Sequence, residues 1–290
     1  MPELPEVETV RIGLNKFIRG KKIVAVTYDT AKSFPNPEAD VKQFLIGAAI
    51  SSVHRRAKVL IIELSSQYAL VIHLKMTGQL VYQSHRQHFG AGHPSPSLVN
   101  RLPDKSTRVV FSFSDKSKLF FNDQRKFGWV RLLPSSEVAN IDFFKKVGPE
   151  PLAADFHWQD FRDRLQHRSK STIKAALLDQ TVIAGIGNIY ADESLWAAKI
   201  HPSQRVNELS PRAIHKLFDE MVAILKLAIA NGGSTDRNYV DAAGKQGNYL
   251  KFARVFRREG QLCPRCKHRI IKLRVAGRGT HICPVCQRLR

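Results

Sequence analysis

The sequence predicts an α+β protein of two domains: an N-terminal antiparallel β-sandwich with a helix at its start, and a C-terminal helical domain ending in a zinc ribbon. Up to residue 133, short segments rich in Val, Ile and Phe follow one another without helices between them. After a Pro/Gly cluster at 147–151, helical periodicity dominates. Two CxxC pairs near the C-terminus are typical of a metal-binding ribbon. A chain of 290 residues is long enough for two hydrophobic cores.

The first domain begins with a helix and continues as strands. Apolar residues recur at helical spacing from Pro5 to Ile18, which predicts a helix with one buried face. Strands are expected at 22–28, 59–64, 69–74, 108–113, 118–121 and 128–133, with a hairpin turn at 115–117. Residues 84–106 are polar and without periodicity, and their three histidines lack the tight spacing of metal ligands. We therefore expect a solvated loop there in preference to a metal site.

The second domain has helical signals with clear ends. Helices are expected at 155–166, 172–179, 188–198 and 210–231. The last of them has Ser210 as a capping residue and Pro211 in its first turn, and Gly232 and Gly233 end it. We place the domain boundaries at 1–133 for the sandwich, 134–151 for a linker, 152–248 for the helical domain and 249–290 for the zinc ribbon.

The chain is strongly basic, with 46 Lys and Arg residues against 25 Asp and Glu, a formal charge of +21. Such an excess raises the affinity for a polyanion, and nucleic acid is the usual partner of a protein of this charge. Residues 245–290 contain thirteen Lys or Arg and a single acid, Glu259. This distribution indicates a folded body with a basic appendage.

Membrane insertion and secretion are not expected. The most apolar stretch, 221–230, contains Lys226 and is shorter than the roughly 20 residues of a spanning helix. Acidic residues at Glu3, Glu6 and Glu8 occupy the positions where a secretory signal would be basic. We expect a cytoplasmic protein.

The four cysteines form two pairs whose spacing suits a zinc site. Cys263 and Cys266 are separated from Cys283 and Cys286 by sixteen residues, and four thiolates around zinc make a closed, structural centre. Two disulfides or a redox CxxC remain as the alternative, less consistent with a cytosolic chain that has no other cysteine. Basic residues between the pairs suit a hairpin that grips phosphates.

The amino terminus offers an unusual nucleophile. Removal of Met1 before Pro2 leaves a secondary amine, and an α-amino group with a pKa near 8 has a sizeable neutral fraction at physiological pH. Neutral amines attack carbonyl-like carbons to form Schiff bases, and carboxylates at Glu3 and Glu6 could move protons nearby. Taken alone, these residues are better explained as an ordinary start with an acidic first helical turn.

Five motifs occur in a fixed order along the chain: PELPEVE at 2–8, HLKMTG at 73–78, NDQRKFG at 122–128, GIGNIY at 185–190 and GRGTH at 277–281. This series closely resembles the bacterial formamidopyrimidine-DNA glycosylase family, over residues 2–287. Leu4 favours this family over the related endonuclease VIII group, which usually begins Pro-Glu-Gly-Pro-Glu.

The resemblance implies a base excision repair enzyme that removes oxidised purines, such as 8-oxoguanine and formamidopyrimidines, and then cleaves the strand by β,δ-elimination. Pro2 matches the nucleophile that attacks C1′ and Glu3 the acid that protonates the sugar oxygen. Lys58 matches the catalytic lysine of a β-hairpin, and Arg278 the zinc-hairpin arginine that contacts phosphate and assists the final elimination. The 1–133 domain is thus the expected catalytic domain.

The resemblance also implies an interface with double-stranded DNA. Residues 177–196 resemble the helix–two-turns–helix element of the family, which makes 152–248 the expected DNA-binding domain. Met76, Arg125 and Phe127 match residues that fill the void left by an everted nucleotide. Taken alone, Met76 and Phe127 would more simply pack in the core, but the neighbouring glycines and charged residues favour loop tips. Glu6 is expected to take part in base recognition. The expected DNA contacts are His73, Met76, Arg125, Phe127, Lys170, Lys174, Asn188 and Tyr190.

Some positions depart from the family pattern. Ser106 stands where the family often has a histidine, so that DNA contact is in doubt. The loop 84–106 looks longer than usual, and 234–247 falls where the family has a variable damaged-base recognition loop.

We expect one structural zinc ion, a monomer, and a bacterial cytoplasmic location with attachment to the nucleoid through DNA. Three other functions stay open at this point: an endonuclease VIII-like enzyme for oxidised pyrimidines, a non-catalytic zinc-ribbon DNA-binding protein, and an RNA-binding protein.

Overall fold

The computed structural model describes residues 2–93, 95–98, 100–234 and 249–289, which fold as two compact units. Unit 1 comprises Met1–Lys145 and Asn231–Asn248, and unit 2 comprises Lys146–Ala230 and Tyr249–Arg290. The expected linker, 134–151, contains a 3₁₀ helix, η3 (Ser135–Asn140), and a short helix, α3 (Asp142–Lys146). The four boundaries drawn from the sequence stay a prediction.

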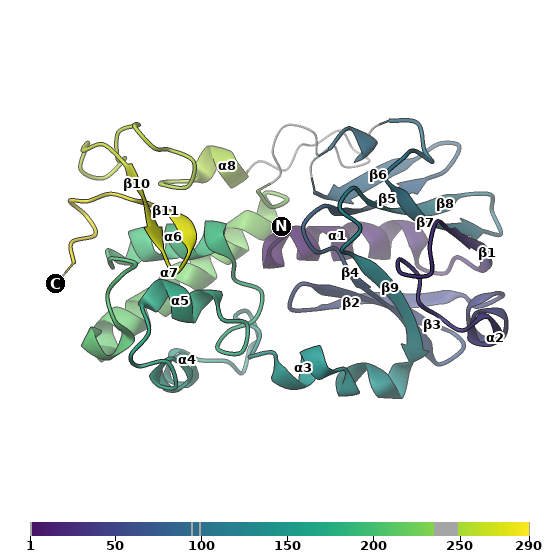
Figure 1. Cartoon of the computed structure of the whole chain (residues 1–290), viewed down its shortest axis with the longest axis horizontal. Helices are drawn as coiled ribbons and strands as arrows, with labels where there is room; N and C mark the ends of the chain where they lie inside the picture. The colour runs from purple at the N-terminus through teal and green to yellow at the C-terminus, as the bar shows by residue number, and fades with distance from the viewer. Residues whose placement is uncertain (1, 94, 99, 235–248, 290) are drawn as a thin grey trace. The chain divides into compact units, whose positions relative to one another are not determined.

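Unit 1 is an antiparallel β-sandwich, which confirms the predicted fold class (Figure 1). One sheet has the strand order β1-β7-β8-β5-β6 and the other β2-β3-β4-β9, and every pairing is antiparallel. The strands are β1 (Ile23–Tyr28), β2 (Ile50–Arg56), β3 (Val59–Leu64), β4 (Tyr68–His73), β5 (Gly78–Gln83), β6 (His88–Gly92), β7 (Thr107–Phe113), β8 (Lys118–Asp123) and β9 (Trp129–Pro134). A three-residue helix, α2 (Glu38–Asp40), continues into a π-helical turn, η1 (Val41–Leu45).

Helix α1 (Leu4–Ile18) lies between the two sheets and completes their core (Figure 1). Its buried residues Val7, Val10, Leu14 and Ile18 follow the predicted helical spacing. Gly13 is required by packing, because a Cβ there would lie 1.9 Å from a ring carbon of Phe89. The core therefore holds the amino end of the chain in a fixed place in unit 1.

The expectation of a solvated loop at 84–106 is wrong. The segment contains β6 and a 3₁₀ helix, η2 (Pro96–Leu98), and nine of its 21 described residues are buried. Phe89 stacks on Phe17 of α1 at 5.4 Å between ring centroids, and this contact buries the strand despite its glycines. Ser106 is also buried and bonds to Asp104 and Ser97, so it belongs to this local network.

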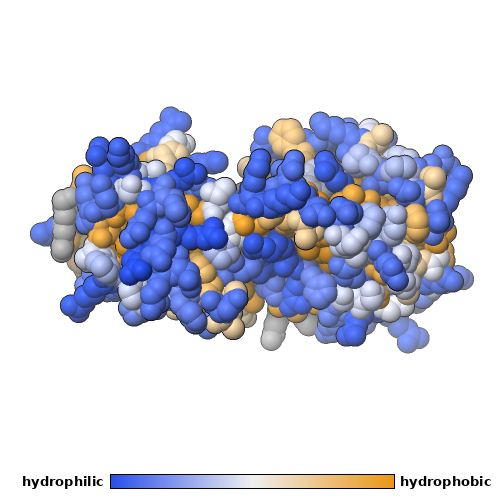
Figure 2. Space-filling view, turned by 90° about the horizontal axis from the view of Figure 1, so that it is seen from below, coloured by the Kyte–Doolittle hydropathy of each residue, from blue (hydrophilic) through white to orange (hydrophobic). Residues whose placement is uncertain are grey.

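Unit 2 is helical and ends in a β-hairpin, as predicted. Its elements are α4 (Trp158–Gln166), α5 (Ile173–Leu178), α6 (Asn188–Ala198), α7 (Pro211–Ala230), α8 (Tyr249–Phe252), a 3₁₀ turn η4 (Val206–Glu208), and strands β10 (Ile271–Val275) and β11 (Arg278–Ile282). Ser210 caps α7 by accepting a hydrogen bond from the backbone N–H of Ala213. Helix α6 is almost wholly buried at the centre of the unit. The face of unit 2 in the left half of Figure 2 is largely hydrophilic.

Among the helices that the structure describes, none combines the length and the apolarity that crossing a membrane requires.

Candidate functional site

The amino end of α1 is a buried, acidic cap. Pro2 and Glu3 are buried, and Glu3 is the N-cap residue of the helix. The backbone N–H of Glu3 donates to Oε2 of Glu6 at 2.8 Å, forming one half of a capping box. A carboxylate at this end also interacts favourably with the helix dipole. The sequence thus places the residue that follows Pro2 in a single, hydrogen-bonded conformation.

Glu6 uses its second oxygen elsewhere in unit 1. Oε1 of Glu6 accepts the backbone N–H of Ser234 at 2.7 Å. Gly233 has φ of +80°, and a Cβ there would lie 2.9 Å from Oε1, so only glycine fits this approach. Glu6 therefore holds the chain where the expected recognition loop begins; residues 235–247 of that loop lie outside the described residues.

Lys58 lies in the turn between β2 and β3, and an ion pair ties this turn to α1. Arg55 Nε donates to Oε2 of Glu8 at 2.9 Å, and Arg55 Nη1 donates to the carbonyl of Ala57 at 2.8 Å. Ala57 has a positive φ of 52°, which makes the turn tight. Burial of Glu8 is outweighed by its bonds to Arg11 and Arg55, which lower the pKa of Glu8. Lys58 is only 5% exposed.

His73 is a neutral, buried histidine on the strand that pairs with β3. Burial, reinforced by the charges of Lys75 and Lys58, lowers the pKa of His73 to about 3. The backbone N–H of Lys75 donates to His73 Nδ1 at 3.0 Å, so Nε2 carries the proton of the neutral ring. His73 can therefore offer one uncharged N–H donor.

Met76, Arg125 and Phe127 lie on two exposed turns, each of which connects one sheet of the sandwich to the other. Met76 is 39% exposed in the turn before β5, and Phe127 is 49% exposed in the turn between β8 and β9. The Arg125 guanidinium lies over the Phe127 ring, 4.8 Å from its centroid. This exposure excludes core packing, the alternative left open by the sequence.

Asp123, a residue that the sequence reasoning did not single out, organises both turns. It is 1% exposed and accepts from the backbone N–H of Arg125 at 3.2 Å, of Phe127 at 2.8 Å and of Gly128 at 2.7 Å. It also accepts from the hydroxyl of Thr77, which lies beside Met76. One buried carboxylate therefore fixes the backbone that carries all three exposed side chains. The only feature of the sequence that could have identified Asp123 is its place within the NDQRKFG motif.

We expect Asp123→Ala to lower the stability of unit 1 by about 2–4 kcal/mol, since several buried donors lose a charged acceptor. Affinity for duplex DNA should fall by about tenfold or more if the two turns contact DNA. Asp115→Ala is the matched control, because Asp115 organises the turn at the opposite end of β8 by accepting from Ser117. The measurements are thermal unfolding and duplex titration; equal loss of DNA affinity in both variants would contradict a specific role for Asp123.

The turns that lead into α6 are held by Gln180. Its Nε2 donates to the carbonyl of Ile186 at 2.8 Å, and its Oε1 accepts the backbone N–H of Gly185 at 3.0 Å. These bonds present the amino end of α6, where Asn188 is half-buried. A helix amino terminus offers backbone donors that suit a phosphate.

The remaining expected DNA contacts of unit 2 differ in their exposure to solvent. Lys170 is exposed in the turn before α5. Tyr190, in contrast, is fully buried and packs on Tyr249, so its ring is not available to a ligand. Lys174 is also fully buried, and its Nζ lies 2.6 Å from Oδ1 of Asp192. This corrects the expectation of a phosphate contact, because an enclosed ammonium cannot reach a ligand at the surface.

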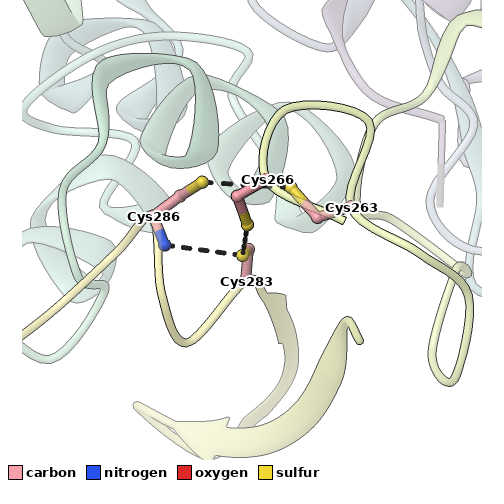
Figure 3. A group of neighbouring side chains, drawn as sticks. All are labelled: Cys263, Cys266, Cys283 and Cys286. Carbon is pink, nitrogen blue, oxygen red and sulfur yellow. Dashed lines mark hydrogen bonds between the residues drawn. The ribbon is translucent and has the colours of Figure 1, made fainter. Parts of the chain in front are cut away.

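The four cysteines lie together as the spacing predicts (Figure 3). Their sulfur atoms all lie within 4.8 Å of one another, and the nearest pair, Cys266 and Cys283, is 3.3 Å apart. All four are free thiols, which excludes disulfides. Zinc with sulfur at 2.3 Å requires sulfurs about 3.8 Å apart, so the group fits this ion. Among the described residues it is the one group suited to a metal; the histidines of 84–106 form none.

The electrostatics of the cysteines also suit a metal. A backbone hydrogen bond from His268 lowers the pKa of the Cys266 thiol to about 6, which favours the thiolate that zinc binds. Burial raises the pKa of Cys283 to about 12, so its deprotonation would depend on the ion itself. Arg278 begins β11 and is exposed, directly after the turn of the hairpin.

Two exposed turns on a β-sandwich, a helix–two-turns–helix element and a four-cysteine cluster are together typical of DNA-binding proteins with a zinc finger. Known families match in the same order. Residues 1–130 match the formamidopyrimidine-DNA glycosylase N-terminal domain, 147–239 the formamidopyrimidine-DNA glycosylase H2TH domain, and 260–289 a zinc finger found in FPG and IleRS.

Individual relatives agree over the whole chain. A formamidopyrimidine-DNA glycosylase of Streptococcus pyogenes is 42% identical, with 100% of both chains covered. A Lactococcus lactis FPG variant bound to a Fapy-dG containing DNA is 38% identical, with a TM-score of 0.87 over 99% of this chain and 100% of that one. The Lactococcus lactis Fpg bound to an abasic site containing DNA is 38% identical, with a TM-score of 0.86 over 99% of each chain. The chain belongs to the formamidopyrimidine-DNA glycosylase family.

Proposed function

We propose that this chain is a bifunctional DNA glycosylase and AP lyase that removes oxidised purines, such as 8-oxoguanine and formamidopyrimidines, from double-stranded DNA. The observation that carries the proposal is the placement of Pro2 and Glu3 at the buried amino end of α1, tied through Glu8 and Arg55 to the turn that holds Lys58. The family membership supports it, as do the relatives bound to Fapy-dG and abasic-site DNA.

Chemistry begins once Met1 has been removed. The neutral amine of Pro2 attacks C1′ of the damaged nucleotide, a C1′–N bond forms, and the bond from C1′ to the base breaks. The base leaves with the electron pair of that bond and takes up a proton. Glu3 donates a proton to the sugar ring oxygen as the C1′–O bond opens, which leaves an iminium between Pro2 and C1′.

The iminium makes strand cleavage possible. It acidifies the proton on C2′, whose removal expels the 3′ phosphate, and a second elimination expels the 5′ phosphate. Lys58, buried near His73, acts mainly in the earlier excision step, as the proton-handling lysine of the hairpin. Arg278 contacts a phosphate and assists the last elimination. Water then hydrolyses the iminium, and the product is a one-nucleotide gap with phosphorylated ends.

Access to C1′ requires that the nucleotide leave the stack. Met76, Arg125 and Phe127 fill the space, and their exposure on turns fixed by Asp123 suits an apolar wedge, a hydrogen-bonding guanidinium and a stacking ring. The DNA sugar–phosphate backbone is contacted by His73, Lys170 and Asn188. Glu6 acts on base recognition through its bond to Ser234, at the start of the expected recognition loop.

One zinc ion held by Cys263, Cys266, Cys283 and Cys286 would order the ribbon and take no part in the chemistry, because four thiolates leave it no open position. We further propose a monomer that works in the bacterial cytoplasm on nucleoid DNA. Substrate choice is tested by comparing excision from duplexes that contain one oxidised purine or one oxidised pyrimidine. Faster release of the oxidised purine is expected. Faster release of the oxidised pyrimidine would mean that the chain has the substrate specificity of endonuclease VIII.

We expect Lys58→Ala to slow base excision by about 10²-fold while cleavage of a pre-formed abasic site falls by less than about tenfold. The open aldehyde of an abasic site needs less activation than an intact glycosidic bond. Single-turnover assays on the two substrates measure the difference. Lys42→Ala, at a lysine whose side chain is 73% exposed, is the control and should match the wild type. Equal losses on both substrates would contradict the assignment of Lys58.

A further inference from the structure

A buried ion pair joins the two helices at the centre of unit 2. Lys174 of α5 and Asp192 of α6 both have side chains with 0% exposure, and Nζ lies 2.6 Å from Oδ1. Desolvating two charges costs several kcal/mol for each ion, and their attraction offsets this only when the remaining donors and acceptors are also satisfied. The other partners of the pair therefore show what it holds in place.

Those partners are successive residues of β11. Lys174 Nζ donates to Oγ1 of Thr280 at 2.6 Å and lies 3.4 Å from the carbonyl of Gly279. Oδ2 of Asp192 accepts the backbone N–H of His281 at 2.9 Å. The three residues that directly follow Arg278 are thus held by one buried pair.

The amino end of α6 holds the same strand from another side. Asn188 Nδ2 donates to the carbonyl of Gly279 at 3.0 Å. The position of Gly279 is therefore also set by α6, whose amino end has backbone donors that suit a phosphate. Lys272 and Arg274 of the neighbouring strand β10 differ from these residues of β11, because both are exposed to solvent.

The cysteine knuckles have attachments of their own. Arg265 donates to the carbonyls of Trp196 and Ala197 at 3.1 and 3.2 Å, and Gln287 Nε2 donates to the carbonyl of Ile200 at 2.9 Å. Loss of the buried pair should thus leave the cysteines grouped and release mainly the hairpin tip.

We propose that Lys174 and Asp192 form a positioning pair. The pair fixes the backbone of β11 and thereby the direction in which the Arg278 side chain projects from the surface. The pair acts through Arg278 and touches no DNA itself. The proposal rests on the proposed function only for the phosphate contact of Arg278.

The test replaces both charges together. A single replacement would leave an uncompensated buried charge, which would unfold unit 2 whatever the role of the pair. Lys174→Met with Asp192→Asn keeps the volume and an acceptor for His281 but removes the bonds to Thr280 and Gly279. We expect this double variant to bind zinc at the wild-type level and to have a similar Tm. Amide hydrogen exchange at 278–281 should become at least tenfold faster.

Duplex binding provides the second readout. The slope of log Kd against log salt should fall by about 0.9, the value for one phosphate contact. Arg278→Ala should produce the same fall, and adding it to the double variant should change nothing more. Lys42→Met with Glu38→Gln is the control: it removes an exposed ion pair, likewise without changing the net charge, and should keep the wild-type slope and exchange.

Wild-type exchange and salt slope in a stable, zinc-loaded double variant would overturn the proposal and leave the pair a purely structural one. If the double variant does not fold, Thr280→Val carries the test instead: it leaves the ion pair intact but removes the contact with Lys174 and the hydroxyl's bond to the carbonyl of Arg278 at 3.0 Å. Both readouts are taken without base excision. An inactive wild-type enzyme would therefore refute the proposed function while these results still decide the role of the pair.

Discussion

Inserting one glycine between Met1 and Pro2 is expected to lower base excision by more than about 10³-fold and to abolish covalent trapping by borohydride. The inserted residue turns the Pro2 nitrogen into an amide, which is not nucleophilic, and moves the free amine one residue away. Because Glu3 is held by its bond to Glu6, the displaced amine cannot simply take the place of the proline nitrogen.

The fold should survive this change. The core of unit 1 does not depend on the amino group, so Tm and zinc content should match the wild type, and lesion DNA should bind within about threefold. Single-turnover excision gives the rate. A variant that retains wild-type excision would show that another group, such as Lys58, is the nucleophile.

Cys283→Ser is expected to reduce zinc content below about one fifth of an ion per chain and to weaken duplex binding by about 100-fold. A hydroxyl is a poor replacement for a thiolate, and structural zinc contributes on the order of 10 kcal/mol to the folding of small zinc domains. Cys283 is completely buried, so its loss also disturbs the packing of the ribbon around Trp196 and Val255. Arg278 would then lie on a disordered hairpin.

The control for this prediction lies in the same knuckle. Pro284→Ala, at an exposed residue between Cys283 and Cys286, should retain zinc and duplex affinity. Metal content by elemental analysis and titration of labelled duplex provide the two measurements. Unchanged affinity in a zinc-free Cys283→Ser variant would mean that the ribbon does not take part in binding DNA.

The sequence predicts most of the sandwich because strands such as β3 and β7 are dense in branched and aromatic residues. Three strands were missed, and each for a physical reason. β2 ends in HRR, β5 begins at a glycine, and β6 reads HFGAG without a β-branched residue. The burial of β6 comes from the ring of Phe89, which packs on Phe17 and Gly13 of α1, 72 and 76 residues away, and local propensity contains no sign of such a contact.

The motifs predicted the residues of the candidate site. They did not predict the hydrogen bonds that hold those residues in place. The exposed turn at Phe127 follows from the neighbouring charged and glycine residues, but the four donors on Asp123 come from two separate turns. Lys174 looks like a surface lysine on a short helix. Its burial depends on Asp192 and Thr280, 18 and 106 residues further along the chain. Contacts over such separations appear only in the folded chain.

The most direct test is to reduce the reaction of this protein on an oxidised-purine duplex with borohydride and to map the attached peptide by mass spectrometry. We predict one stable adduct, with the sugar remnant on the nitrogen of Pro2 in chains that have lost Met1. An adduct on a lysine, or full excision by chains that still carry Met1, would contradict catalysis by the amino-terminal proline.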